Sequence, residues 1–224
     1  MTNKPKSNWN PNEYYKDQNV AESYDGKRFT SLAGRLFNWI EKRLVRRAFS
    51  SLPKGALLGD IPTGTGRLAE VLLEDGFQVV GLDISGDMLA VAARRLSRFG
   101  TMFRTEVCDA RELKEKGYMF EGVLCARVLM HFPLDEQIVF LRNAAAAARH
   151  RIVFTQGIDT PYHRLRRSLK RMLRHQVPAG YPLTPEDLAT LITKAGLREV
   201  KRTYVLPIVS EAMVIECVAA SPGA

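Results

Sequence analysis

The stretch Asp60-Ile61-Pro62-Thr63-Gly64-Thr65-Gly66-Arg67-Leu68 decides the fold class of this 224-residue chain. The apolar run Ala56-Leu57-Leu58 leads into it, and apolar residues at helical spacing follow it up to Leu73. Gly64 and Gly66 therefore lie on a turn from a strand to a helix, where glycine lets the backbone come close to a ligand. The stretch predicts a nucleotide-type loop at the edge of an α/β sheet.

Two classes of ligand use such a turn, and the charge of the loop separates them. Gly64-x-Gly66-x-x-Ala69 satisfies the dinucleotide fingerprint. A pyrophosphate, however, needs backbone N–H donors and no nearby anion, whereas Asp60 brings a carboxylate and Pro62 removes one N–H. S-adenosylmethionine has no phosphate, and its amino group and sulfonium are cationic. The loop therefore favours S-adenosyl-L-methionine as cofactor over a nicotinamide or flavin dinucleotide.

Composition predicts one large domain without a membrane span. The chain is 46% hydrophobic, yet no apolar run approaches the roughly 18 residues that a transmembrane helix needs. Residues 1–12 are polar and lack the apolar segment of a signal peptide, so we expect a cytoplasmic protein. Cys108, Cys125 and Cys217 are widely spaced, which indicates buried free thiols rather than metal ligands. No metal is expected.

Downstream of the loop, strand and helix patterns alternate. Strands are predicted over 77–82, 101–107, 119–126 and 151–155, and helices over 86–99 and 134–149. Thr184 and Pro185 cap a further helix that ends near Gly196. The last strands, 197–206 and 211–219, are joined by a link too short for a crossover, so the final strand should be antiparallel. We predict a Rossmann-like, doubly wound, seven-stranded sheet.

Five motifs in order resemble the class I S-adenosylmethionine-dependent methyltransferases. The resemblance spans about residues 57–218 and is greatest to the small-molecule branch that includes the ubiquinone and menaquinone biosynthesis enzymes. The family's loop usually has glycine where this chain has Pro62. The motifs are the Asp-x-x-x-Gly-x-Gly loop, Gly81-Leu82-Asp83-Ile84-Ser85 with Met88-Leu89, Cys108-Asp109-Ala110, Arg127-Val128-Leu129-Met130-His131-Phe132, and Leu183-Thr184-Pro185-Glu186-Asp187-Leu188 with Ala195-Gly196-Leu197.

The resemblance implies a role for each cofactor motif. Asp83 would accept both ribose hydroxyls while Ile84 packs on the adenine, unless Asp83 only caps a helix. Asp109 would accept from the adenine amino group, with the Ala110 N–H offered to a ring nitrogen, unless Asp109 is a plain turn residue. Asp60 would hold the methionine amino group, directly or through water. Further cofactor-binding candidates are Thr63, Gly64, Gly66, Met88, Cys125, Ala126 and Arg127.

The N-terminal part is expected to cap the cofactor. The resemblance implies a helical cap over residues 1–54 and a methyltransferase domain over 55–224, with a lid insert at 160–182. Tyr24 and Arg28 are candidates to meet the cofactor from the cap. The alternative is that both belong to a local helix surface.

The expected reaction is direct transfer of the methyl group from sulfonium to a nucleophile, in which placing the reactants in line supplies much of the rate. If the acceptor is a hydroxyl, His131 is the best-placed general base, because it follows the fourth strand. A structural histidine under the next helix is the alternative.

Positive charge is concentrated in two segments. Residues 27–47 carry seven basic residues and one acid, and residues 163–175 carry six and none, so each segment is net +6 in a chain of net +9. Both are amphipathic. One interpretation places the apolar faces on the core and leaves a solvated basic surface.

The other interpretation gives the two basic segments a function. They occupy the positions of the family's lid over the acceptor, so they would bind an anionic or amphiphilic small molecule, such as a phosphorylated or lipid-linked intermediate. An anionic membrane surface is a possible peripheral partner. Arg164, Arg167 and Arg171 are the candidate substrate-binding residues.

Two other functions compete with this one. The basic balance, with pI about 9.6, fits an RNA methyltransferase, but no RNA-binding module is visible. The fourth strand also lacks the Asn-Pro-Pro-Tyr type of motif used for methylation of base amino groups, so O- or C-methylation is favoured over N-methylation. A non-catalytic S-adenosylmethionine-binding module is the second rival. Oligomeric state is not predicted.

Overall fold

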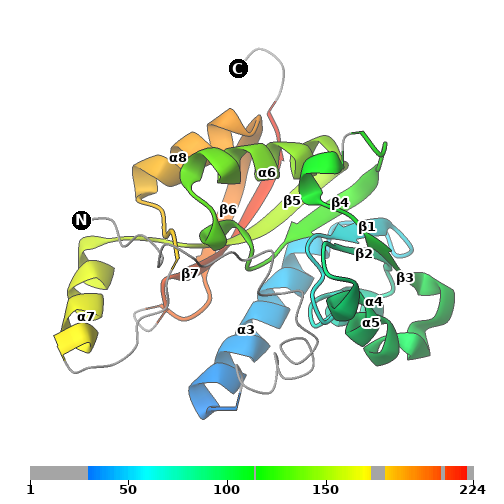
Figure 1. The fold of residues 1–224 in the computed structure, drawn as a ribbon, viewed down its shortest axis with the longest axis horizontal. Coiled ribbons are helices and arrows are strands. Elements are labelled where there is room, and N and C mark those ends of the chain that lie inside the picture. Colours follow the sequence, from blue (N-terminus) through cyan, green and yellow to red (C-terminus); the bar gives the residue numbers. More distant parts are fainter. Residues whose placement is uncertain (1–29, 114, 173–179, 208–209, 221–224) are drawn as a thin grey trace.

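The computed structural model describes residues 30–113, 115–172, 180–207 and 210–220, with the side chains of residues 170 and 171 outside the description. A single sheet runs through the molecule in the strand order β3-β2-β1-β4-β5-β7-β6 (Figure 1). The strands are β1 (Leu57–Asp60), β2 (Gln78–Asp83), β3 (Phe103–Val107), β4 (Phe120–Cys125), β5 (Ala148–Gly157), β6 (Leu197–Tyr204) and β7 (Ala212–Ala219).

The strand directions confirm the predicted fold class. β1 pairs in parallel with both β2 and β4. β2 also pairs in parallel with β3, and β4 pairs in parallel with β5. β7 lies antiparallel between β5 and β6. The short link between β6 and β7 forces this reversal, because a parallel pair needs a longer crossover.

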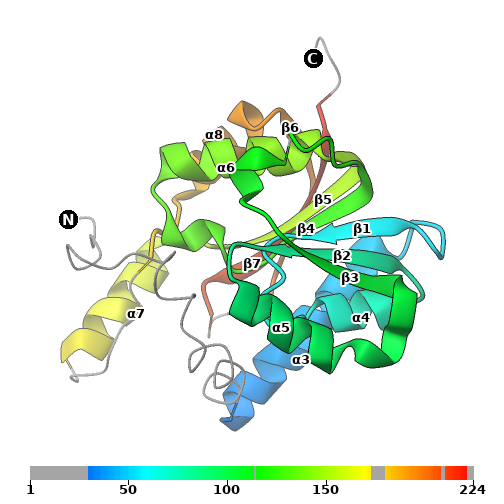
Figure 2. The ribbon, with the colours of Figure 1, turned by 45° about the vertical axis from the view of Figure 1, so that its right-hand side comes forward.

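Helices cover both faces of the sheet (Figures 1 and 2). Apolar residues of α6 (Leu134–Ala146) and α8 (Pro185–Lys194) share one core cluster with the strands, and those of α3 (Leu32–Phe49) and α4 (Ala69–Glu74) share the other. α5 (Gly86–Arg95) lies beside α4, and α7 (Pro161–Met172) follows β5. Short 3-10 turns span Ser97–Met102, Ala110–Glu112 and Leu129–His131.

Three predicted boundaries were wrong. The helix at 86–99 ends at Arg95 and continues as a 3-10 turn in which Gly100 has φ of 54°. The helix at 134–149 ends at Ala146, and β5 begins at Ala148 instead of residue 151. β5 is longer than predicted because it pairs with β4 from Ala148 onward and with β7 as far as Gly157. Pairing on both sides overrides the local pattern.

The predicted cap of the α8 helix is confirmed. The Thr184 hydroxyl accepts a hydrogen bond from the Asp187 N–H at 3.1 Å, Pro185 is the first helical residue, and Gly196 follows the helix with φ of 75°. None of the helices in the described part of the chain combines the length and the apolar character that crossing a membrane would require.

Candidate functional site

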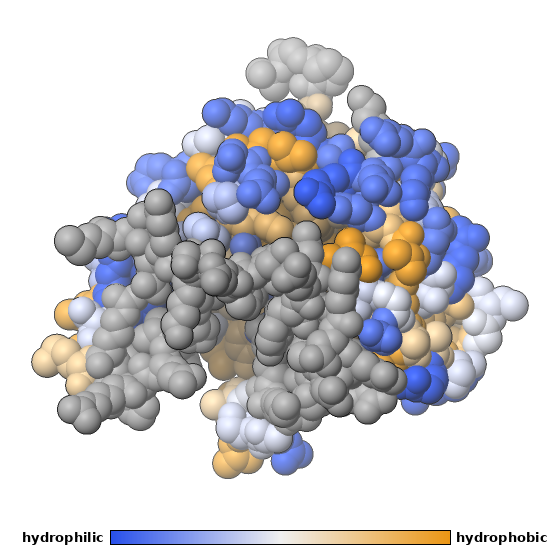
Figure 3. All heavy atoms as spheres, viewed as in Figure 1, coloured by the Kyte–Doolittle hydropathy of each residue, from blue (hydrophilic) through white to orange (hydrophobic). Residues whose placement is uncertain are grey.

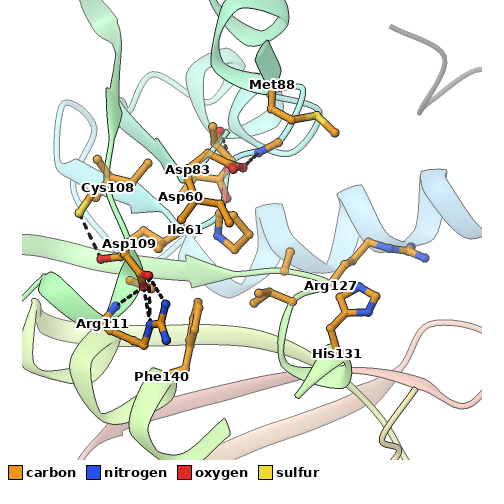
Figure 4. Close-up of a pocket in the computed structure, with 18 of the residues that line it drawn as sticks. Asp60, Ile61, Asp83, Met88, Cys108, Asp109, Arg111, Arg127, His131 and Phe140 are labelled. Carbon is orange, nitrogen blue, oxygen red and sulfur yellow. Dashed lines mark hydrogen bonds and ion pairs between the residues drawn. The ribbon is translucent and has the colours of Figure 1, made fainter. Parts of the chain in front are cut away.

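A cavity of about 380 Å³ lies at the carboxyl ends of β1, β2 and β4 (Figure 4). Parallel α/β sheets place their ligand sites at this edge, where the strand order reverses. Its lining residues are Asp60, Ile61, Pro62, Thr63, Gly64, Thr65, Arg67, Leu68, Leu82, Asp83, Ile84, Met88, Cys108, Asp109, Ala110, Arg111, Ala126, Arg127, Val128, His131, Phe132, Asp135, Glu136, Val139 and Phe140.

Backbone N–H groups of the glycine loop are already engaged within the protein. Thr63 N donates to Leu82 O at 2.9 Å, Gly64 N donates to the Asp83 carboxylate at 2.9 Å, and Gly66 N donates to Thr63 O at 3.0 Å. A pyrophosphate would need such donors to be available. The loop therefore does not present these three donors to a phosphate.

The two glycines of the loop serve different purposes. Both have positive φ, 54° at Gly64 and 76° at Gly66. A Cβ on Gly64 would meet open space, and Gly64 lines the cavity, so ligand approach is possible there. A Cβ on Gly66 would lie 2.7 Å from Leu96 Cδ1, and Gly66 is not among the lining residues. Close packing of the loop on the end of α5 is thus sufficient reason for Gly66.

Asp60 forms the buried floor of the cavity. It is 1% exposed at the end of β1, and it accepts a hydrogen bond from the Thr63 hydroxyl at 2.9 Å. Burial raises the pKa of Asp60 to about 7, opposed by its bond to Thr63 and by the charge of Arg67. A cationic group in the cavity would favour the ionised form of this carboxylate.

Asp83 is the second buried carboxylate, at the end of β2. Its oxygens accept from Gly64 N at 2.9 Å and Ser85 N at 3.0 Å, and burial raises its pKa. Each carboxylate oxygen can accept a further hydrogen bond, so Asp83 retains capacity for two hydroxyls. Beside it, the buried Met88 and the half-buried Ile84 provide apolar wall.

Asp109 is held by Arg111, which was not among the predicted site residues. The Arg111 guanidinium contacts both Asp109 oxygens, at 3.0, 3.0 and 2.5 Å, and the Arg111 N–H also donates to Asp109 at 2.9 Å (Figure 4). The hydrogen bonds to Arg111 lower the pKa of Asp109. Ala110 is buried and lines the cavity. An adenine amino group would share Asp109 with Arg111.

The opposite wall of the cavity comes from the segment after β4 and from α6. His131 lies there with Phe132, and α6 contributes Val139 and Phe140. The phenyl rings of Phe132 and Phe140 are stacked 6.3 Å apart. Val139 and Phe140 were not predicted as site residues, because nothing in a single sequence indicates which face of α6 borders a cavity.

The residues around the end of β4 divide between core and cavity. Ala126 and Arg127 line the cavity, whereas Cys125 is fully buried and outside the lining, and burial raises the pKa of its thiol. Arg127 has φ of 61°, in the left-handed region, and its N–H donates to the Thr155 hydroxyl at 2.7 Å. Arg127 thus lines the cavity from a turn with left-handed backbone conformation.

A buried acid on α3 joins two arginines of the cavity. Glu41 is 1% exposed; it contacts the Arg67 guanidinium at 2.6 Å and the Arg127 guanidinium at 3.5 Å. Asn38 accepts from Arg67 at 2.5 Å, and the Arg127 guanidinium lies 5.2 Å from the Phe37 ring centroid. The sequence does contain a feature that points to Glu41, since it is the single acid of the basic segment 27–47.

The remaining predicted site residues lie away from the cavity or outside the description. Tyr24 and Arg28 fall outside the described residues, as does the side chain of Arg171. Arg164 pairs with Asp159 at 3.1 Å. Arg167 pairs with Asp159 and with Glu211, at 2.7 Å for the latter. Neither Arg164 nor Arg167 lines the cavity.

These groups suit a ligand that is cationic at one end and carries a ribose and a base at the other. Asp60 and Asp83 supply negative charge and acceptors, while Ile84, Met88 and the aromatic wall supply apolar contact. Among the residues that the structure describes, no three His, Cys, Asp or Glu side chains gather in a way that could hold a metal ion.

Comparison with known proteins agrees with this geometry. Residues 59–151 match the family described as "Methyltransferase domain". Magnesium-protoporphyrin O-methyltransferase of Synechocystis is 28% identical over 108 residues, 48% of this chain and 46% of that protein. Demethylmenaquinone methyltransferase of Thermus thermophilus is 35% identical over 109 residues, 48% of each. The matches thus span about half the length of these curated relatives.

A solved structure shares the fold over nearly the whole chain. Magnesium protoporphyrin IX methyltransferase from Synechocystis PCC 6803, crystallised with bound S-adenosylhomocysteine, superposes with a TM-score of 0.75. The match covers 93% of this chain and 98% of that one at 17% sequence identity. Residues 59–151 thus match a methyltransferase domain, and the chain shares its fold with a methyltransferase crystallised with S-adenosylhomocysteine.

Proposed function

We propose that the protein transfers a methyl group from S-adenosylmethionine to an amphiphilic or anionic small molecule, at oxygen or carbon. One observation carries the proposal: Asp60 and Asp83 share a single cavity with an apolar wall of Phe132, Val139 and Phe140. The carboxylates suit the cofactor. The apolar wall and His131 would contact the methyl acceptor beside it.

The cofactor supplies an activated methyl group, and the chain's residues orient it. Asp60 would bind the cationic amino group, and Asp83 would accept from the ribose hydroxyls. Asp109 and the Ala110 N–H would meet the adenine edge, with Ile84 against its face. Fixed contacts of this kind hold the reacting atoms in line, which reduces the entropic part of the barrier.

His131 is the proposed general base when the acceptor is a hydroxyl. It lines the cavity just beyond β4, beside Arg127 (Figure 4). An imidazole there can accept the proton that a hydroxyl loses as it attacks. His131→Gln should lower kcat while leaving cofactor affinity unchanged. A loss of cofactor affinity instead would show that His131 has a structural role.

The acceptor is proposed to be amphiphilic first and anionic second. Apolar side chains dominate the wall beside His131, whereas Arg164 and Arg167 are already paired with Asp159 and Glu211. A phosphate group could bind these arginines only if it displaced the carboxylates with which they are paired. We keep them, with Arg171, as proposed contacts for an anionic acceptor.

The cofactor site can be tested by calorimetric titration with S-adenosylhomocysteine. Asp83→Ala should weaken binding by about 1 to 3 kcal/mol, because charge-assisted hydrogen bonds to the ribose are lost. Asp87→Ala, in the first turn of α5, is the matched control and should bind normally. Unchanged affinity in Asp83→Ala would remove the assigned role, and tight binding of a dinucleotide would remove the proposal.

The acceptor can be identified with labelled cofactor. The protein is incubated with methyl-labelled S-adenosylmethionine and an extract of the cells that make it, and the labelled product is fractionated into metabolites, lipids and RNA. We expect the label in a small molecule or lipid. Label in RNA would favour the rival function, and cofactor binding without any labelled product would favour a non-catalytic module.

A further inference from the structure

One side of α7 carries four large apolar residues that face away from the protein. Tyr162, Leu165, Leu169 and Met172 recur at intervals of three or four, so they lie along one face of the helix. They are 48%, 62%, 50% and 79% exposed, respectively. Single exposed apolar residues are ordinary on protein surfaces, whereas a continuous row of four marks an interaction surface.

The polar side of α7 is the side that contacts the protein. His163 is buried, and its ring nitrogen Nδ1 lies 2.9 Å from the Thr160 hydroxyl. Arg167 is largely buried by its ion pairs with Asp159 and Glu211. A surface helix normally turns its apolar stripe to the core. α7 is therefore inverted, with polar groups inward and apolar groups outward.

The outer half of α3 presents a second apolar row. Leu32, Leu36 and Trp39 lie on one face and are 82%, 49% and 57% exposed. The Arg43 guanidinium lies 5.6 Å from the Trp39 ring centroid. Figures 1 and 2 show that this end of α3 and the far end of α7 project from the sheet on the same side.

Charge identifies the chemistry of the partner. The segments 27–47 and 163–175 are each net +6, while the whole chain is net +9, so the rest of the chain is slightly acidic. The acids that pair with α3 and α7, such as Glu74 and Glu211, neutralise only part of this charge. A second copy of the chain would bring the remaining like charges together on these faces, which is unfavourable. A partner that is both negatively charged and apolar beneath its charge fits better.

We infer that α7 and the outer half of α3 form a docking surface for an anionic lipid bilayer. The apolar rows would enter the boundary between headgroups and acyl chains, with Trp39 at the interface. Basic side chains beside the rows, such as Arg35 and Arg43, would approach the lipid phosphates. α7 follows the carboxyl end of β5, the sheet edge at which the cavity lies, so docking would bring the cavity near the lipid. That last consequence rests on the proposed function; the docking itself does not.

Vesicle sedimentation of the full chain tests the surface without any need for catalysis. Vesicles of phosphatidylcholine alone are compared with vesicles that also contain phosphatidylserine, each at low and high salt. We expect co-sedimentation with the anionic vesicles at low salt and its loss at high salt, because screening removes the electrostatic part. Equal binding to neutral and anionic vesicles, or no binding to either kind, would overturn the inference. Binding of RNA by the protein would not rescue it.

Matched variants locate the surface. Leu165→Ser combined with Leu169→Ser should reduce partitioning into anionic vesicles by about tenfold, because two apolar contacts with lipid are lost. Val200→Ser, which replaces a comparably exposed apolar residue on β6, should leave partitioning unchanged. All positions are exposed, so thermal unfolding should match that of the wild type. Wild-type partitioning by the Leu165/Leu169 variant would refute the assigned face.

Calorimetric titration of the same variants with S-adenosylhomocysteine separates the two proposals. A docking variant that still binds S-adenosylhomocysteine leaves the proposed function intact, and an Asp83→Ala protein that still sediments with anionic vesicles leaves the docking surface intact.

Discussion

The segments 27–47 and 163–175, which contain most of α3 and α7, are both amphipathic and each net +6, yet the two helices are held in different ways. The inner half of α3 packs Val45, Ala48 and Phe49 into the core, whereas α7 buries His163 and exposes its apolar row. Amphipathic periodicity predicts a helix with two faces; it does not say which face meets the protein.

The acidic residues near α3 also distinguish it from α7. Lys42 pairs with Glu70 at 3.2 Å, and Arg46 pairs with Glu74 and Asp75, so α4 neutralises part of the charge of α3. Most of these pairs are exposed and contribute little to stability. The buried contact of Glu41 with Arg67 is of another kind, since it ties α3 to the cofactor loop. α3 is thus part of the site, and α7 stands beside it.

The largest expected effect concerns the core face of α3. Phe49 is fully buried against β4, where a Cβ on Gly122 would lie 2.7 Å from its ring. Phe49→Ala should lower the free energy of unfolding by about 3 to 5 kcal/mol, as large-to-small core substitutions do. Leu169→Ala on α7 should change it by less than about 0.5 kcal/mol. Urea unfolding measures both, and equal losses would end the contrast between the helices.

The next effect tests the buried acid. Glu41→Gln should destabilise the protein by about 3 kcal/mol, because the guanidinium of Arg67 would stay buried without its counter-charge. Arg164→Gln, which breaks the exposed pair with Asp159, should cost less than about 1 kcal/mol. If Glu41→Gln were as mild as Arg164→Gln, the link between α3 and the cofactor loop would carry no stability.

A smaller effect concerns cofactor affinity, which should depend on the charge of Asp60 in the cavity and not on the charges of α7. The pKa of Asp60 is raised to about 7 by burial, so its ionised fraction rises steeply between pH 6 and pH 8. Affinity for S-adenosylhomocysteine, whose amino group is cationic, should rise about tenfold over this interval. Calorimetric titration measures it. Asp60→Asn should abolish the rise and Arg164→Gln should keep it; a flat wild-type profile would contradict the assigned contact.

The smallest effect concerns how α7 is anchored. Burial lowers the pKa of His163 below its usual value, and the charges of Arg166 and Arg167 act in the same direction, against Glu211 and Asp159. The folded state therefore prefers neutral His163: its contribution is complete above pH 6.5 and is lost as the pH falls from there toward the lowered pKa. Amide exchange in α7, corrected for intrinsic rates, should accelerate on acidification while exchange in α3 does not. His163→Gln should remove this dependence, and equal behaviour of both helices would contradict it.

Much of the cofactor half was predictable from local sequence. The loop from Asp60 to Leu68, the strand ends at Asp83 and Asp109, and the cap at Thr184 are short-range features whose chemistry is set within a few residues. The antiparallel last strand followed from the length of a link. The positions of these residues were predictable because backbone geometry and nearest neighbours decide them, whereas their roles toward the cofactor stay predictions.

The wall opposite the cofactor loop was not predictable in the same way. Phe140 and Val139 reach the cavity from α6, and Arg111 reaches Asp109, through the packing of elements that are distant in the chain or through a rotamer choice. The pairing of Arg164 and Arg167 with Asp159 and Glu211 likewise depends on how α7 meets the start of β7. A single sequence holds no record of such contacts.

By itself, the sequence determined the fold class, the glycine loop between a strand and a helix, and the presence of two basic amphipathic helices, because periodicity, glycine conformation and charge are properties of short segments. Only the tertiary structure decided which charges are neutralised and which apolar faces are covered. Those outcomes depend on burial and on ion pairs between distant residues, as with Glu41 beneath Arg67 and Arg127 and with the outward-facing row from Tyr162 to Met172.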